Sequence, residues 1–138
     1  MIKVDIIKNC KDILTRYEEI VFTYIFGTFA QDKMRVDSDI DIAIYLNSKI
    51  DIDKYLEIKA DLSEICKKEI DLIILNEATP LLKYQIYKNN IPLFTRDKGA
   101  ETKYKIKTLF EYNDMKRYLD LSYDKNIDRL KKEVELSG

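Results

Sequence analysis

The stretch "FGTFAQDKMRVDSDIDIAIYL", residues 26–46, combines a glycine turn with two acids inside an apolar run. Gly27 is followed by Thr28, and Asp39 and Asp41 stand two residues apart in "DIDIAIYL". Side chains alternate between the faces of a strand, so the isoleucines share one face and both aspartates share the other, about 6–7 Å apart. Two carboxylates this close repel each other and resist burial, so the pattern calls for a physical reason.

The segments around this stretch predict how it is held. The run "IVFTYIF" (20–26) is β-branched and aromatic, which predicts a short buried strand that ends at Gly27. The glycine and hydroxyl residue that follow predict a tight turn into a short helix, with Thr28 near its N-terminus. A polar loop (33–38) then leads to a second strand (39–46).

The rest of the chain predicts an α+β domain with a helical tail. A third strand (70–76) follows a helix of about 51–68, which can cross over to bring that strand beside the second one. The other predicted elements are a helix over 6–17, a helix over 79–88 opened by Thr79 and Pro80, an edge strand over 91–96 that contains Pro92, and two helical segments over about 101–119 and 121–135.

Length and charge restrict the class of protein. The chain has 138 residues, 46% of them hydrophobic, which predicts one domain over 1–138, with a core of about 1–96 and C-terminal helices of about 100–136. Charged residues make up 36% but nearly cancel to a net charge of -1, which argues against direct nucleic-acid binding through bulk electrostatics.

The sequence also bears on the location of the protein and on the side chains available for catalysis. The charged first residues and the lack of any run of about 18 apolar residues argue against a signal peptide or membrane span, so a cytoplasmic protein is expected. Cys10 and Cys66 fall in helical segments and are interpreted as small buried side chains. The chain contains no histidine, so chemistry must rest on carboxylates, hydroxyls, lysine, arginine or a hard metal ion.

The acids and the glycine turn together favour phosphoryl or nucleotidyl transfer. Mg²⁺ prefers oxygen ligands, and Asp71, in the third strand, adds a carboxylate to Asp39 and Asp41. The Gly27 turn can offer backbone N–H groups to phosphates. Taken singly, the acids could be solvent-facing and the turn could be an ordinary one. Their order in a single strand–turn–strand–helix–strand unit is what favours a shared site.

At this point "GTFAQDKMRVDSDIDIAI" resembles the signature of the DNA polymerase β-like nucleotidyltransferase superfamily. The resemblance covers about residues 20–76 and is closer to the minimal nucleotidyltransferases, the antitoxins of HEPN/MNT toxin–antitoxin pairs. It implies a polymerase β-like fold, with a small mixed β-sheet, flanking helices and a C-terminal helical segment. More weakly, "RYLDL" (117–121) resembles the tails of that group.

The resemblance also implies roles for individual residues. Gly27 and Thr28 would bind the nucleotide phosphates. Asp39 and Asp41 would hold two Mg²⁺ ions, and Asp71 would complete the metal site and help to deprotonate the acceptor hydroxyl.

Some positions match the family and others depart from it. Ser38 matches the serine that precedes the acids, and is expected to contribute to nucleotide binding. Thr28 replaces the usual serine and keeps its hydroxyl. Gln31 and Asp32 stand where many relatives carry Arg-Gly, which removes a possible phosphate contact.

Three functions remain open at this stage. The resemblance implies an Mg²⁺-dependent enzyme that transfers AMP from ATP to a tyrosine hydroxyl of a HEPN-type toxin, because the short tail leaves no room for a substrate domain. Tyr112, Tyr118 and Tyr123 form a candidate docking stripe, although any one of them could equally pack on the sheet. The alternatives are a binding-only antitoxin that acts by occlusion and a stand-alone transferase for a small hydroxylated molecule such as an aminoglycoside.

Overall fold

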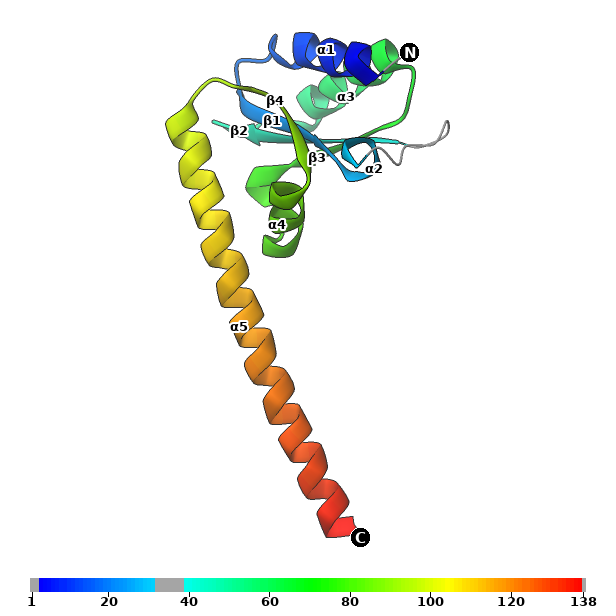
Figure 1. Ribbon diagram of the computed structural model, residues 1–138. Helices are drawn as coiled ribbons and strands as arrows, with labels where there is room; N and C mark the ends of the chain where they lie inside the picture. The colour runs from blue at the N-terminus through cyan, green and yellow to red at the C-terminus, as the bar shows by residue number, and fades with distance from the viewer. Residues whose placement is uncertain (1–2, 32–38, 138) are drawn as a thin grey trace.

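The computed structural model describes residues 3–31 and 39–137, and Figure 1 shows how their elements are arranged. Helices α1 and α3 lie on one face of a β-sheet, α4 lies on the other face, and α5 extends away from the sheet (Figure 1). The elements in chain order are α1 (Lys3–Leu14), β1 (Ile20–Phe26), α2 (Gly27–Ala30), β2 (Ile40–Leu46), α3 (Ile52–Cys66), β3 (Ile70–Ile74), the 3-10 turn η1 (Leu75–Glu77), α4 (Pro80–Lys88), β4 (Asn90–Thr95) and α5 (Lys98–Ser137).

The sheet has the order β3-β2-β1-β4 and is mixed, as predicted. Strands β2 and β3 are parallel and are joined through α3, whereas β1 pairs antiparallel with both β2 and β4. Strand β4 lies at an edge and contains Pro92, which confirms the interpretation of that proline. This order puts the first residues of β2 beside the last residue of β1, and the first residues of β3 at the same end of the sheet, on the other side of β2.

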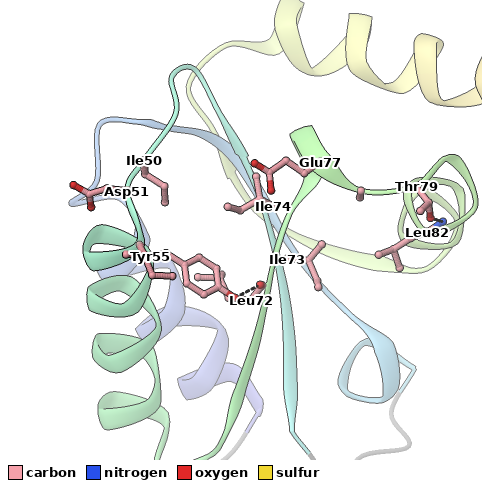
Figure 2. A pocket seen from close by; sticks show the side chains of 11 residues that line it. Ile50, Asp51, Tyr55, Leu72, Ile73, Ile74, Glu77, Thr79 and Leu82 are labelled. Atoms are coloured by element: carbon pink, nitrogen blue, oxygen red, sulfur yellow. Dashed lines mark hydrogen bonds between the residues drawn. The ribbon is translucent and has the colours of Figure 1, made fainter.

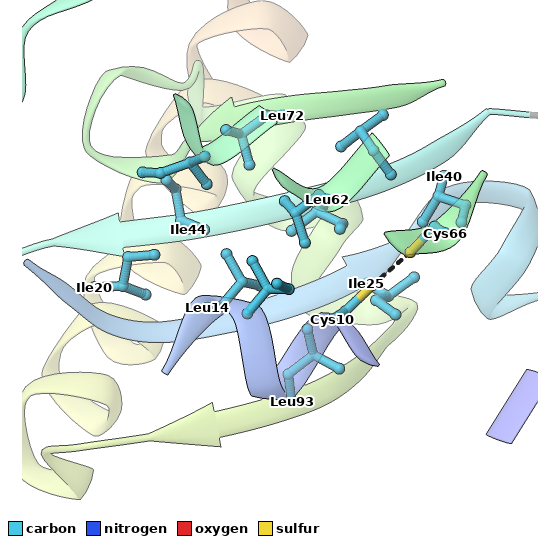
Figure 3. Close-up of a cluster of buried hydrophobic side chains, with 14 of the residues drawn as sticks. Cys10, Leu14, Ile20, Ile25, Ile40, Ile44, Leu62, Cys66, Leu72 and Leu93 are labelled. Atoms are coloured by element: carbon cyan, nitrogen blue, oxygen red, sulfur yellow. Dashed lines mark hydrogen bonds between the residues drawn. The ribbon is translucent and has the colours of Figure 1, made fainter. Parts of the chain in front are cut away.

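One face of the sheet carries the larger hydrophobic core. Ile40, Ile42 and Ile44 of β2 are fully buried there, against α1 and α3 (Figure 3). The predicted alternation along β2 is therefore confirmed, and the opposite face is left for the aspartates. Cys10 and Cys66 are buried free thiols with their sulfur atoms 3.4 Å apart, in keeping with their interpretation as small core side chains.

Most element boundaries lie within a few residues of the predicted ones. Helix α1 begins and ends three residues earlier than predicted, and its end is marked by Thr15, whose hydroxyl donates to the carbonyl of Asp12. Strand β3 ends at Ile74, because the chain turns into η1. Helix α4 begins as predicted, with the Thr79 hydroxyl accepting a hydrogen bond from the N–H of Leu82.

The prediction of two C-terminal helical segments is wrong, because α5 is one continuous helix of 40 residues. Residues 100–137 contain neither proline nor glycine, so nothing in the sequence interrupts the backbone hydrogen bonds. The first half of α5 is anchored by aromatic contacts. Tyr104 packs against Phe22 and Tyr45, and the Tyr112 ring stacks on Tyr84 with centroids 3.6 Å apart.

The second half of α5 carries exposed apolar side chains. Among these, Tyr118 is 70% exposed and Tyr123 is 66% exposed. The helix is nevertheless too polar for a lipid bilayer, and no helix within residues 3–31 and 39–137 is long and apolar enough to cross a membrane.

Asn76 ties η1 to the end of β2, and its removal should destabilise the fold. Its side-chain amide donates to the carbonyl of Leu46 and accepts from the N–H of Leu46, both at 2.9 Å. Asn76→Ala removes both hydrogen bonds, so we expect it to lower the free energy of unfolding by roughly 1–3 kcal/mol in urea denaturation. Asn47→Ala is the matched control, since the Asn47 side chain makes only exposed hydrogen bonds, donating to the Glu18 carbonyl at 3.4 Å and accepting from the Ser48 hydroxyl at 3.0 Å. Equal stability of the two variants would contradict the prediction.

Candidate functional site

The strand register brings the predicted acids to one end of the sheet. In the parallel pairing of β2 with β3, Asp41 lies directly opposite Asp71. Asp39 comes one residue before β2 begins and is exposed, as is Asp71, whereas Asp41 is half-buried. The crossover through α3 therefore brings together carboxylates that are 30 residues apart in the sequence.

Gly27 lies against this group of acids. Phe26, the last residue of β1, is paired with Asp41. Gly27 follows with a backbone φ of +72°, a value that residues with a side chain rarely adopt. A Cβ atom at position 27 would lie 2.0 Å from Oδ2 of Asp41, closer than any real contact. Glycine is thus required twice here, for its backbone angle and for the space that the Asp41 carboxylate occupies.

The neighbouring acids affect the ionisation of Asp41. Burial raises the pKa of Asp41 to about 6, and the charge of Asp71, a hydrogen bond to Asp71 and the charge of Asp39 add to the effect. A like charge disfavours ionisation, so Asp71 and Asp39 add to the effect of burial on Asp41. A divalent cation would relieve this repulsion.

The donor chemistry of the acids suits a hard cation. All three side chains offer carboxylate oxygens, which Mg²⁺ prefers. Among residues 3–31 and 39–137, however, no three His, Cys, Asp or Glu side chains are grouped closely enough to hold a metal ion. The structure brings Asp41 and Asp71 into hydrogen-bonding contact and leaves Asp39 further out.

Of the other predicted site residues, the structure describes some and not others. Thr28 lies in the first turn of α2 with its side chain exposed, as the turn was predicted to present it. Ser38 and Asp32 lie outside the described residues. Gln31 ends α2, where its N–H donates to the carbonyl of Gly27.

A cavity of about 560 Å³ opens beside Gly27 on the α4 side of the sheet. Helices α4 and α5 supply most of its wall, including Tyr84, Lys88 and Tyr112. Tyr84 and Lys88 were not predicted as site residues, and Tyr112 was predicted only as part of a docking stripe, because no motif marks them and they are more than 50 residues from Gly27. The one signal is topological: α4 ends two residues before Asn90, which pairs with Phe26.

A second cavity, of about 570 Å³, lies along the free edge of β3 (Figure 2). Its wall includes Tyr55 of α3, whose hydroxyl donates to the carbonyl of Leu72 at 2.7 Å, and Ile73, which points toward α4. Asp71 does not line it, and neither Asp39 nor Asp41 reaches it. None of the three acids lines the cavity beside Gly27 either, but Gly27 lines it and approaches the Asp41 carboxylate, so this cavity is the one that adjoins the acids.

Comparisons with solved structures find the same fold in toxin–antitoxin assemblies. A chain from a toxin–antitoxin crystal structure with AMP-PNP is 23% identical, with a TM-score of 0.68 over 95% of this chain and 99% of that one. A chain from a tri-AMPylated Shewanella oneidensis HEPN toxin in complex with its MNT antitoxin is 19% identical, with a TM-score of 0.68 over 94% of this chain and 99% of that one.

A smaller protein shares the core of this fold. It is a minimal nucleotidyltransferase, 20% identical, with a TM-score of 0.59 over 67% of this chain and 97% of its own. The comparison with curated proteins finds no match.

The family comparison is decisive because it matches sequence over most of the chain. The profile described as "Polymerase beta, Nucleotidyltransferase" matches residues 8–99, from α1 to the start of α5, and so contains Gly27, Asp39, Asp41 and Asp71. The predicted resemblance is confirmed at the level of the family: the chain belongs to the polymerase β nucleotidyltransferase family.

Proposed function

We propose that this nucleotidyltransferase is an antitoxin that transfers AMP from ATP to a tyrosine hydroxyl of a partner HEPN-type RNase toxin and so neutralises it. The observation that carries the proposal is the contact of Gly27 with Asp41, which leaves no room for a Cβ atom between turn and carboxylate. Phosphates on the turn would then lie next to the acids, as transfer of a nucleotidyl group requires.

Each residue of the site has a role in this proposal. The backbone at Gly27 and the hydroxyl of Thr28 bind phosphate oxygens, with Ser38 also contributing. Asp39, Asp41 and Asp71 would hold Mg²⁺, two ions by analogy with the family. When bound, the metal neutralises phosphate charge and allows these carboxylates to lie close together.

The reaction conserves atoms and charge in a single displacement. The tyrosine oxygen of the partner attacks the α-phosphorus of ATP, so an O–P bond forms and the bond to the β-phosphate oxygen breaks. Pyrophosphate leaves with the electron pair of that bond. The hydroxyl proton passes to a carboxylate, a role that we give to Asp71 because it is exposed beside Asp41.

The projecting half of α5 supports a protein acceptor. Tyr112 stacks on Tyr84 and so belongs to the packing of this chain, which removes it from the predicted docking stripe. Tyr118 and Tyr123 remain exposed and can meet a partner. Solved structures with this fold include a complex of an MNT antitoxin with a tri-AMPylated HEPN toxin.

The transfer itself is tested by mass spectrometry. The product of an adjacent HEPN-like gene is incubated with this protein, ATP and Mg²⁺, and we expect its mass to rise by one or more AMP units on tyrosine. Asp39→Asn/Asp41→Asn removes two carboxylates from the site, so transfer should fall by at least about 100-fold.

The same experiment separates the alternatives. A toxin that is neutralised without gaining AMP, by wild type and double variant alike, would show occlusion and overturn the enzymatic proposal. ATP turnover on small hydroxylated acceptors without any protein partner would instead favour a stand-alone transferase.

Gly27→Ala should abolish transfer while leaving the acids in place. The added methyl group meets Oδ2 of Asp41 and imposes a strained φ, so the turn and the carboxylate must separate. We expect a fall of about 100-fold or more in the rate of AMP transfer. Gly99→Ala is the control, since a Cβ there meets only the Asp97 side chain at 3.3 Å. Activity of Gly27→Ala equal to that of the control would contradict the role of the turn.

Asp41→Asn should stabilise the metal-free protein. The pKa of Asp41 is raised in the folded state from 3.8 to about 6, so ionisation destabilises the fold as pH rises through that window. Without metal, the melting temperature of the variant should therefore match wild type near pH 4 and exceed it above pH 6. Adding Mg²⁺ should raise the melting temperature of wild type and not that of Asp41→Asn. Identical responses of both proteins would contradict a cation site at Asp41.

A further inference from the structure

The pairing of β4 with β1 places the C-terminal end of α4 near Gly27, the residue proposed to bind phosphate. Asn90, the first residue of β4, pairs with Phe26, and Phe26 immediately precedes Gly27. Helix α4 ends at Lys88, two residues before Asn90. Its last turn is therefore held at the same end of the sheet as Gly27 and Asp41, although Lys88 is 61 residues from Gly27 in the sequence.

Among the described residues, Lys88 is the only charged side chain that lines the cavity beside Gly27. Its ammonium lies 5.7 Å from the centre of the Tyr84 ring, and it forms no ion pair with a carboxylate among the described residues. Gln31 lines the same cavity and is neutral. Within residues 3–31 and 39–137, the positive charge that lines this cavity therefore comes from Lys88.

The rest of the cavity is suited to a nucleoside. Leu81 and Leu82 of α4 line it beside the stacked rings of Tyr84 and Tyr112, whose planes are within 4° of parallel. Its volume of about 560 Å³ falls in the range of small-molecule sites. An apolar and aromatic wall with one cation at the Gly27 end matches a base joined to a charged phosphate chain.

We propose that this cavity holds the nucleoside triphosphate and that the Lys88 ammonium binds its β- and γ-phosphates. The inference rests on the proposed function and adds the element that Asp41 and Asp71 cannot supply, a cation on the phosphates that leave as pyrophosphate. The α-phosphate stays at Gly27, beside the acids, and the leaving phosphates point into the cavity toward Lys88.

The test is nucleotide binding by isothermal titration calorimetry in saturating Mg²⁺, with AMP-PNP and AMP as the two ligands. Lys88→Met should weaken AMP-PNP binding by about 10- to 100-fold, the effect of losing a hydrogen bond between charged groups, and should leave AMP binding unchanged. Lys88→Arg should retain most of the affinity, because arginine also binds phosphate. Lys49→Met, in the exposed loop at the other end of β2, is the matched control.

The outcomes separate this inference from the proposed function. Equal affinity of Lys88→Met and wild type for AMP-PNP would overturn the role of Lys88, even if wild type transfers AMP to its partner. Equal losses for AMP-PNP and AMP would also overturn it, since Lys88 would then not bind the terminal phosphates. If only AMP-PNP binding falls while no partner accepts AMP, the inference stands and the proposed function fails.

Discussion

The structure depends on one close approach, that of the Gly27 backbone to the carboxylate of Asp41. A Cβ at position 27 would lie 2.0 Å from Oδ2 of Asp41, so only glycine allows the turn to lie this close to the carboxylate. The pairing of Phe26 with Asp41 enforces the approach, and the pairing of Asp41 with Asp71 adds the second carboxylate. Burial and the neighbouring carboxylates raise the pKa of Asp41. A bound cation would reduce the repulsion between these carboxylates.

One face of the sheet packs against the hydrophobic core, and the other carries the acids and the cavity beside Gly27. The isoleucines of β2 bury against α1 and α3 and hold the strand in register, so the acids on the opposite face need not contribute to stability. Helix α4 and the first half of α5 form the wall of a cavity on that opposite face. The second half of α5 contributes little to this packing, and its exposed tyrosines are available to a partner.

Local patterns in the sequence predicted the strands, the glycine turn and the capped helices, because alternation, capping and β-branching act over a few residues. They also predicted that Asp39, Asp41 and Asp71 share one end of a sheet. The continuity of α5 was missed because a polar, irregular stripe does not indicate whether one helix or two will form. Lys88 was missed because its place depends on the pairing of Asn90 with Phe26, a contact across 64 residues that no local pattern carries.

The central claim is that the glycine turn and the acids form one nucleotide-transfer site. The most direct measurement is a crystal structure of the protein with AMP-PNP and Mg²⁺. The account predicts phosphate density against the backbone at Gly27, metal density at Asp41 and Asp71, and the base in the cavity walled by α4 and α5. Density for the nucleotide in the cavity at the β3 edge, with no metal density at Asp41 and Asp71, would contradict it.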